Sequence, residues 1–228
     1  HQQLLREIFG SDIALFAAHL ATLNLSARHI EDEENYPFIA RRNFFEIEPK
    51  KQFCKIPGTR IGSGEPPSEL EIELPTDLGA VVGNPPYVRQ ELIVKDAELK
   101  QLLKKRVLTK EQYEANYKQS KDWLQYLVTQ ACPNLELSKR ADLHCYFWPT
   151  ATRFLKEGGY FGFLTSSSWL DVEYGFALQG WILENFKLVA VLESLDEPWF
   201  EDARVKTCVT ILQRCSNADE RDANLVKF

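Results

Sequence analysis

The 228-residue sequence contains no methionine, not even at position 1, which is more typical of an internal segment than of a complete gene product. No apolar run approaches the roughly 20 residues needed to span a bilayer. No charged segment followed by an apolar one opens the chain, as a secretory signal would. These absences argue against a membrane protein or a secreted protein, and we expect a cytoplasmic one.

The sequence also lacks paired cysteines, clustered histidines and an excess of positive charge. The five cysteines are scattered and never spaced as Cys-x-x-Cys, so neither a disulfide framework nor a zinc site is predicted. His19, His29 and His144 have no partner at ligand spacing, and structural roles are expected for them. With 27 Lys and Arg against 33 Asp and Glu, the net charge is -6. Any contact with nucleic acid must therefore be local or lie outside this chain.

The apolar content is sufficient for one large domain with a core, since 44% of the residues are hydrophobic and 12% are aromatic. Short apolar runs predict strands at residues 6–13, 38–47, 78–83, 158–170, 187–195 and 205–214. Apolar residues at helical spacing predict helices at residues 15–25, 92–107, 111–131, 142–156 and 172–186. This alternation predicts an α/β fold with a doubly wound, mostly parallel sheet and a last strand that is antiparallel.

Two segments interrupt the alternation of strands and helices. Residues 48–76 contain five prolines and three glycines, which predicts a long loop or a loose hairpin. Residues 92–131 carry charged positions between apolar ones at helical period, which predicts a helical insertion lying on the surface. We expect both segments to belong to one domain that covers residues 1–228.

The most informative stretch is VVGNPPY, residues 81–87. A buried strand ends there because two prolines cannot continue its hydrogen bonding. Asp12, Asn43 and Asn84 each follow a predicted strand. Since ligands of open parallel sheets bind at the carboxyl ends of the strands, these three polar side chains are expected on one rim of the sheet.

The stretch Asn-Pro-Pro-Tyr is suited to holding a planar amino group. The lone pair of such an amine is delocalised into its ring, so two acceptors must hold its hydrogens and draw it toward tetrahedral geometry. The side-chain oxygen of Asn84 and the carbonyl of Pro85 can be these acceptors. Tyr87 can stack on the face of a base flipped out of a duplex. This chemistry is orientation with electrostatic stabilisation and requires no strong base.

With these motifs the chain resembles the S-adenosylmethionine-dependent amino-methyltransferases of the Rossmann-like class, and among them the adenine-N6 DNA methyltransferases of restriction-modification systems. The resemblance assigns Asn84, Pro85, Pro86 and Tyr87 to the catalytic site. It also implies the cofactor S-adenosyl-L-methionine and a prokaryotic source. The remaining segments that carry it are GSDIALFAAHLATLNL, ARRNFFEI, DLHCYFWPTATRFLKEGGYFGFLTSSSWL and EPWFEDARVKTCVTIL.

The resemblance also implies roles for residues on the cofactor side and beside the base. Asp12 is expected to bind the ribose hydroxyls, and Ile13 to pack on the cofactor adenine. Asn43, where the family usually has aspartate, is expected to accept a hydrogen from the amino group of that adenine, with Phe44 beside it. Two further residues are implied, Phe147 on the cofactor side and Phe200 beside the flipped base.

The order of the motifs is that of the gamma group, because only 40 residues separate Asn43 from Asn84. In that group a DNA-recognition domain follows the catalytic domain, so double-stranded DNA is expected to bind through a domain beyond Phe228, and a nuclease domain or subunit is a further implied partner. The glycine-rich first motif of the family is not in this chain. We therefore expect a Rossmann-like sheet that is incomplete at its N-terminal end, and an isolated chain that is inactive and binds the cofactor weakly or not at all.

Two other functions remain open from the sequence. Asn-Pro-Pro-Tyr also occurs in methyltransferases that act on a glutamine side-chain amide or on guanine amines of ribosomal RNA. The long helical insertion and the FEDARVKT stretch favour DNA as the substrate. The third reading is a non-catalytic Rossmann-like module of a restriction complex. Asn43 and the missing first motif favour that module, whereas Asp12 and the intact Asn-Pro-Pro-Tyr oppose it.

Overall fold

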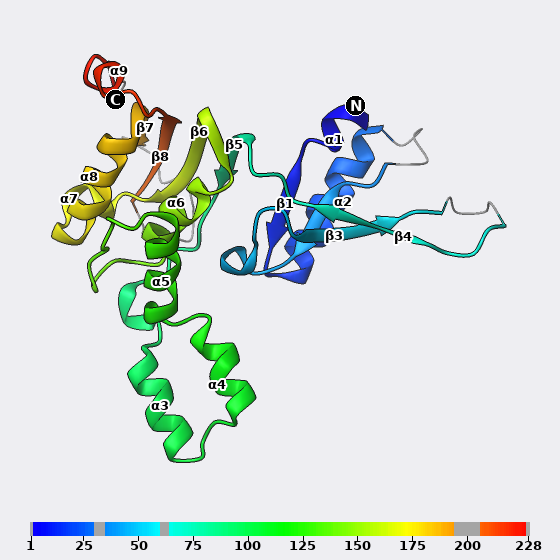
Figure 1. The fold of residues 1–228 in the computed structure, drawn as a ribbon, viewed down its shortest axis with the longest axis horizontal. Helices are drawn as coiled ribbons and strands as arrows, with labels where there is room; N and C mark the ends of the chain where they lie inside the picture. The colour runs from blue at the N-terminus through cyan, green and yellow to red at the C-terminus, as the bar shows by residue number, and fades with distance from the viewer. Residues whose placement is uncertain (1, 30–34, 60–63, 194–205, 227–228) are drawn as a thin grey trace. The chain divides into compact units, whose positions relative to one another are not determined.

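The computed structural model describes residues 2–29, 35–59, 64–193 and 206–226 (Figure 1). The residues expected to form one domain divide into two compact units, His1–Thr76 and Asp77–Phe228. The division falls just before strand β5 (Leu78–Gly83), which is hydrogen-bonded to a single neighbouring strand among the described residues. Each unit is described by itself below.

The first unit is built on a strand–helix–strand element, as predicted. Strand β1 (Phe9–Asp12) pairs in parallel with β2 (Phe38–Arg41), with Phe9 opposite Phe38 and Asp12 opposite Arg41. The rings of Phe9 and Phe38 lie 5.3 Å apart between centroids, and Phe9 also contacts Phe53 at 5.7 Å. The helical segments of this unit are α1 (Gln2–Leu5), α2 (Leu15–Ser26), η1 (Ala27–His29) and η2 (Phe44–Glu46).

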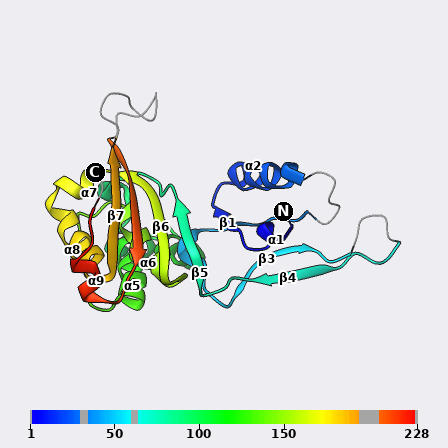
Figure 2. The same ribbon diagram turned by 90° about the horizontal axis from the view of Figure 1, so that it is seen from above.

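Of the two forms expected for residues 48–76, the structure has the hairpin. Strands β3 (Gln52–Pro57) and β4 (Glu69–Glu73) pair antiparallel and form a narrow ribbon (Figure 2). Lys55 donates to Glu69 across the ribbon at 2.9 Å. Most of β4 is exposed, whereas β3 contributes the buried Phe53 to the core of this unit.

The second unit contains a four-stranded sheet in the order β5–β6–β8–β7. Strands β5 and β6 are parallel, and β8 is antiparallel to both β6 and β7, which confirms the α/β class and the antiparallel last strand. Alternate residues of β6 are buried, and Trp148 packs on this buried face with its ring 4.6 Å from that of Phe163. The strands are β5 (Leu78–Gly83), β6 (Leu155–Ser166), β7 (Phe186–Glu193) and β8 (Thr207–Arg214).

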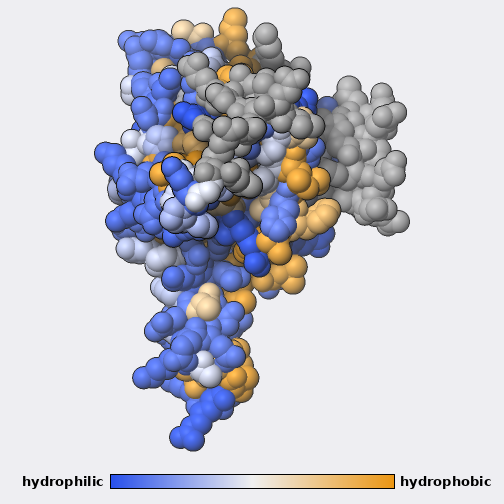
Figure 3. Space-filling view, turned by 90° about the vertical axis from the view of Figure 1, so that its right-hand side faces the viewer, coloured by the Kyte–Doolittle hydropathy of each residue, from blue (hydrophilic) through white to orange (hydrophobic). Residues whose placement is uncertain are grey.

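An arm of two helices, α3 (Asp96–Lys104) and α4 (Lys110–Tyr117), projects from the second unit (Figure 1). The surface of the arm is largely hydrophilic (Figure 3). The hydroxyl of Tyr113 on α4 donates to Asp96 on α3 at 2.7 Å and ties the two helices together. The prediction of one continuous helix over 111–131 is wrong: α4 ends at Tyr117, and a new helix begins where the Ser120 hydroxyl accepts from the backbone N–H of Trp123.

Among the remaining helical segments of the second unit, those within 121–131, 144–152 and 173–185 fall inside predicted helices with shorter bounds, whereas those at 90–92, 168–171 and 218–222 were not predicted. None of the helices within the described residues is both long and apolar enough to cross a bilayer. These segments are η3 (Gln90–Leu92), α5 (Lys121–Ala131), α6 (His144–Thr152), α7 (Ser168–Asp171), η4 (Glu173–Gly175), α8 (Phe176–Asn185) and α9 (Ala218–Asp222).

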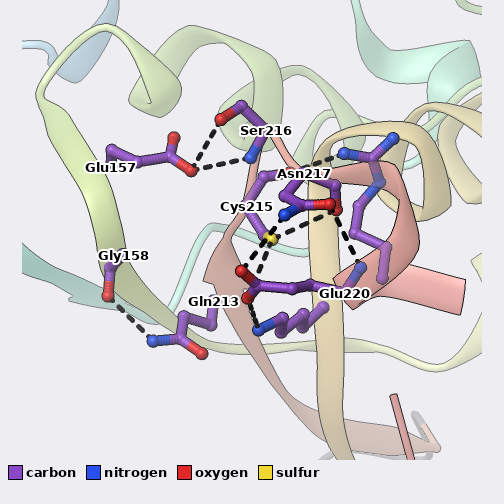
Figure 4. A network of polar contacts seen from close by, with 9 residues as sticks. Glu157, Gly158, Gln213, Cys215, Ser216, Asn217 and Glu220 are labelled. Carbon is purple, nitrogen blue, oxygen red and sulfur yellow. Dashed lines mark hydrogen bonds and ion pairs between the residues drawn. The ribbon is translucent and has the colours of Figure 1, made fainter. Parts of the chain in front are cut away.

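A polar cluster joins the end of β8 and the residues before α9 to the start of β6 (Figure 4). The backbone N–H and hydroxyl of Ser216 both donate to Glu157, at 2.7 and 3.0 Å. Gln213 donates to the carbonyl of Gly158 at 3.1 Å. Since β5 and β6 are parallel, this cluster lies at the opposite end of the strands from Asn84, and we assign it a structural role.

Candidate functional site

Asn84 lies directly after β5, which ends at Gly83 as predicted from the two prolines. Its side chain is exposed, whereas Pro85 is buried and Pro86 is exposed. The buried Pro85 ring fixes the backbone at that position, because proline has one narrow range of φ. The arrangement leaves the amide of Asn84 open to a ligand while the chain beside it is held in place.

Tyr87 lies half-buried against β6. Its hydroxyl is 3.5 Å from the carbonyl oxygen of Leu164, a long donor–acceptor distance. Burial raises the pKa of Tyr87, so the side chain remains a neutral phenol at physiological pH. A half-exposed neutral ring beside Asn84 has the properties needed for stacking on a base.

The loop that follows Tyr87 is held by the segment that precedes α6. The backbone N–H of Gln90 donates to the Asp142 carboxylate at 2.8 Å. The backbone N–H of Leu143 donates to the carbonyl of Val88 at 3.0 Å. Asp142 and Leu143 thus hold Gln90 and Val88 of the loop. Gln90 and Asp142 are 52 positions apart in the sequence.

The same carboxylate continues into a chain of hydroxyl groups. The Tyr174 hydroxyl donates to the second oxygen of Asp142 at 3.0 Å and lies 2.6 Å from the Ser168 hydroxyl. Ser168 in turn lies 2.9 Å from the hydroxyl of Ser166, the last residue of β6. Burial is the largest cause that raises the pKa of Tyr174. Sequence reasoning assigned no role to these residues, and no local pattern signals partners so distant in the chain.

Lys121 is a further support of the loop. Its ammonium donates to the side-chain oxygen of Gln90 at 2.7 Å and to the carbonyl of Lys139 at 2.8 Å. The residue is only 8% exposed, and desolvation lowers its pKa. A buried ammonium is costly unless it is hydrogen-bonded, so Lys121 adds a strong constraint on Gln90.

Two of the residues expected to bind the cofactor lie in the first unit, at the carboxyl end of β1. One carboxylate oxygen of Asp12 accepts from the backbone N–H of Ala14 at 2.7 Å, and the Asp12 side chain is exposed. Ile13 beside it is 62% exposed. The exposed Asp12 carboxylate can accept hydrogen bonds from hydroxyl groups, and the exposed Ile13 side chain can pack on the face of a planar ring.

Asn43 and Phe44 lie after β2, the strand next to β1. The side-chain oxygen of Asn43 accepts from the backbone N–H of Phe45 at 3.2 Å and thereby caps η2. A carbonyl oxygen has two lone pairs, so this amide can accept a second hydrogen bond. Phe44 is half-buried, with its ring 5.6 Å from that of Phe45.

The other expected site residues lie elsewhere. Phe147 is half-buried on α6 in the second unit, and Phe200 lies outside the described residues. No group of three or more histidine, cysteine or acidic side chains suited to a metal ion occurs in the part of the chain that the structure describes. His144 is fully buried, neither of its ring nitrogens has a hydrogen-bond partner among the described residues, and burial lowers its pKa to about 4.

Comparison with known protein families gives a match over most of the chain. The family model described as Eco57I restriction-modification methylase matches residues 6–139 and 133–200. The type II methyltransferase M.XhoI of Xanthomonas vasicola is 28% identical over 146 residues, which cover 64% of this chain and 21% of that protein. The type II methyltransferase M.PaeR7I of Pseudomonas aeruginosa is 30% identical over 135 residues, which cover 59% of this chain and 18% of that protein. The matches thus span about a fifth of the length of these relatives.

Solved structures share the fold at low sequence identity. The type IIG restriction endonuclease BpuSI gives a TM-score of 0.59 at 17% identity, with 93% of this chain and 20% of that chain covered. The ATP-dependent type ISP restriction-modification enzyme LlaBIII bound to DNA gives 0.57 at 16% identity, with 94% and 15% covered. These similarities show the fold of the chain, a partial Rossmann-like α/β arrangement.

Proposed function

The chain belongs to the Eco57I restriction-modification methylase family, and from this premise we propose that it is the catalytic segment of a site-specific DNA adenine-N6 methyltransferase. The observation that carries the proposal is the position of Asn84: an exposed amide at the carboxyl end of β5, followed by a buried proline and a half-buried tyrosine. The similarity to type II methyltransferases favours DNA over a glutamine amide or ribosomal RNA as the substrate.

In the proposed mechanism Asn84 and Pro85 hold the amino group of a flipped adenine. The Asn84 side-chain oxygen accepts one amine hydrogen, and the Pro85 carbonyl accepts the other. Both acceptors favour a tetrahedral nitrogen whose lone pair is available for reaction. The cofactor S-adenosyl-L-methionine supplies an electrophilic methyl group on a sulfonium when it is bound.

The residues of the first unit fit the cofactor side of this proposal. Asp12 keeps one carboxylate oxygen for ribose hydroxyls after its bond to Ala14. Ile13 is exposed for contact with the adenine ring. Asn43 retains acceptor capacity for the adenine amino group, with Phe44 beside it. In the second unit, Phe147 is proposed as a further contact on the cofactor side.

Tyr87 is proposed to stack on the flipped base, and its half-exposed ring supports this role. Phe200 is proposed as a second aromatic contact with the base. Because the net charge of the chain is -6, we propose that double-stranded DNA is bound mainly by a separate recognition domain. A nuclease domain or subunit is proposed as a further partner. The reaction would take place in the cytoplasm of a prokaryotic cell.

The test is transfer of a labelled methyl group to unmethylated genomic DNA by the complete protein. We expect label in N6-methyladenine after digestion to nucleosides, and a loss of about 10²- to 10³-fold in kcat for Asn84→Ala, as for removal of one stabilising group. Asn116→Ala, which changes an exposed asparagine of the arm, is the matched control and should retain full activity. Equal activity of the Asn84→Ala protein, or label in another base, would contradict the proposal.

A further inference from the structure

We propose that Asp142 is a positioning residue for methyl transfer, which holds the loop from Asn84 to Gln90 against the end of β6. This inference rests on the proposed function, because it assigns the residue a role in keeping Asn84 in its reactive place. It is carried by a continuous set of hydrogen bonds, here called the Asp142 bridge. The bridge consists of Gln90, Asp142, Tyr174, Ser168 and Ser166.

One oxygen of the carboxylate fixes the loop. It accepts from the backbone N–H of Gln90, six residues after Asn84. The neighbouring bond from Leu143 to Val88 and the side-chain bond from Lys121 to Gln90 act on the same loop. The loop therefore has three anchors between residues 88 and 90, and the Asp142 carboxylate also accepts from the Tyr174 hydroxyl.

The other oxygen connects the loop to β6. It accepts from the Tyr174 hydroxyl, which leads through Ser168 to Ser166. Strand β6 is the hydrogen-bonded neighbour of β5, with Phe163 opposite Gly83. The Asp142 bridge thus joins the loop that follows β5 to the carboxyl end of the adjacent parallel strand β6, and Asn84 is the first residue of that loop.

This geometry bears on catalysis because Asn84 is exposed and must be kept in place by its surroundings. Displacing a catalytic group by about 1 Å can lower the rate of the reaction about a hundredfold, even when that group is chemically intact. Loss of the carboxylate would also leave the Gln90 N–H without its acceptor. We therefore expect Asp142 to affect the rate of methyl transfer more than the binding of either substrate.

The structure offers a matched pair of tyrosines for the test. Tyr174→Phe and Tyr113→Phe each remove a hydroxyl that donates to an aspartate, at 3.0 and 2.7 Å, but Tyr113 and its partner Asp96 lie in the arm. In the complete protein, we expect Tyr174→Phe to lower kcat several-fold and Asp142→Ala to lower it about ten- to a hundredfold, with KM for DNA and cofactor within about twofold. Asp142→Asn should recover most of the loss, because its amide oxygen can still accept from Gln90 and the Tyr174 hydroxyl can accept from its NH2. Tyr113→Phe and Asp96→Ala should leave kcat unchanged.

Two results would overturn the inference while the proposed function stands. One is a wild-type rate in both Tyr174→Phe and Asp142→Ala; the other is an equal loss of kcat in Tyr113→Phe. Hydrogen exchange of residues 84–92 gives a readout that does not depend on activity or on the folding of the alanine variant. Faster exchange of these residues in Tyr174→Phe than in Tyr113→Phe would support the Asp142 bridge, and equal exchange would refute it. This result is independent of the proposed function, since it can be read even if the wild-type protein transfers no methyl group.

Discussion

Burial of His144 makes the free energy of unfolding of the second unit depend on pH. Its imidazole is fully buried in α6, and neither ring nitrogen has a hydrogen-bond partner among the described residues. Burial, partly opposed by the charge of Asp142, lowers its pKa from 6.5 to about 4. The folded chain therefore keeps His144 neutral at pH values at which the unfolded chain protonates it.

The sign and size of the effect follow from these two pKa values. Above pH 6.5 the imidazole is largely neutral in both the folded and the unfolded state, so its protonation takes nothing from the free energy of unfolding. As the pH falls from 6.5 toward 4, the unfolded state binds a proton that the folded state does not, and stability is lost. The loss from this group alone is about 2 kcal/mol between pH 7 and pH 5, and about 3 kcal/mol by pH 4.

The perturbation is His144→Leu, which replaces a buried unpaired imidazole with an apolar side chain of similar volume. The assay is urea unfolding of the 228-residue chain at pH 7 and pH 5, followed by tryptophan fluorescence, since all five tryptophans lie in residues 77–228. We expect the wild-type chain to lose about 2 kcal/mol more than the variant between the two pH values. Parallel losses in both proteins would refute the reasoning. The variant should also be at least as stable at pH 7, because a buried polar group without a partner costs about 1–3 kcal/mol.

Three further predictions concern the site and its support. Gly175→Ala should destabilise the protein by several kcal/mol in thermal melting, because a Cβ there would lie 1.9 Å from the Trp169 carbonyl oxygen. Gly180→Ala is the control and should be neutral or stabilising, since a Cβ there would have nothing within 4 Å. Tyr87→Ala should lower methyl transfer about tenfold or more through lost stacking, and Tyr87→Phe should retain most activity; equal losses would point to the hydroxyl instead. Calorimetry should show weak or no binding of S-adenosyl-L-methionine to the 228-residue chain alone, and tight binding would contradict the role expected for a glycine-rich first motif.

The strand ends of the site were predictable because local chemistry determines them. Two prolines cannot continue a strand, and β5 ends at Gly83 for that reason. The strand–helix–strand element that ends β1 at Asp12 was likewise visible in the spacing of apolar residues. These features depend on neighbours within a few residues, which a single sequence displays.

Other features depend on contacts between distant segments and were not predictable. The break between α4 and α5 was missed because apolar spacing continues across it, while the Ser120 cap starts a new helix. The role of Asp142 depends on partners 52 and 32 residues away. The division into two units reflects strand pairing, and pairing partners are not set by the local pattern.

Strand β5 carries Asn84 at its tip, yet among the described residues it is hydrogen-bonded on one side only. Its outer side presents amide and carbonyl groups that can pair with another extended segment. Within the sheet, β5 is therefore supported by β6, and the loop that follows Asn84 is supported by Asp142, Leu143 and Lys121. We expect a peptide segment that paired with this edge of β5 to restrain Asn84, and thereby to affect the proposed methyl transfer without contacting the substrate.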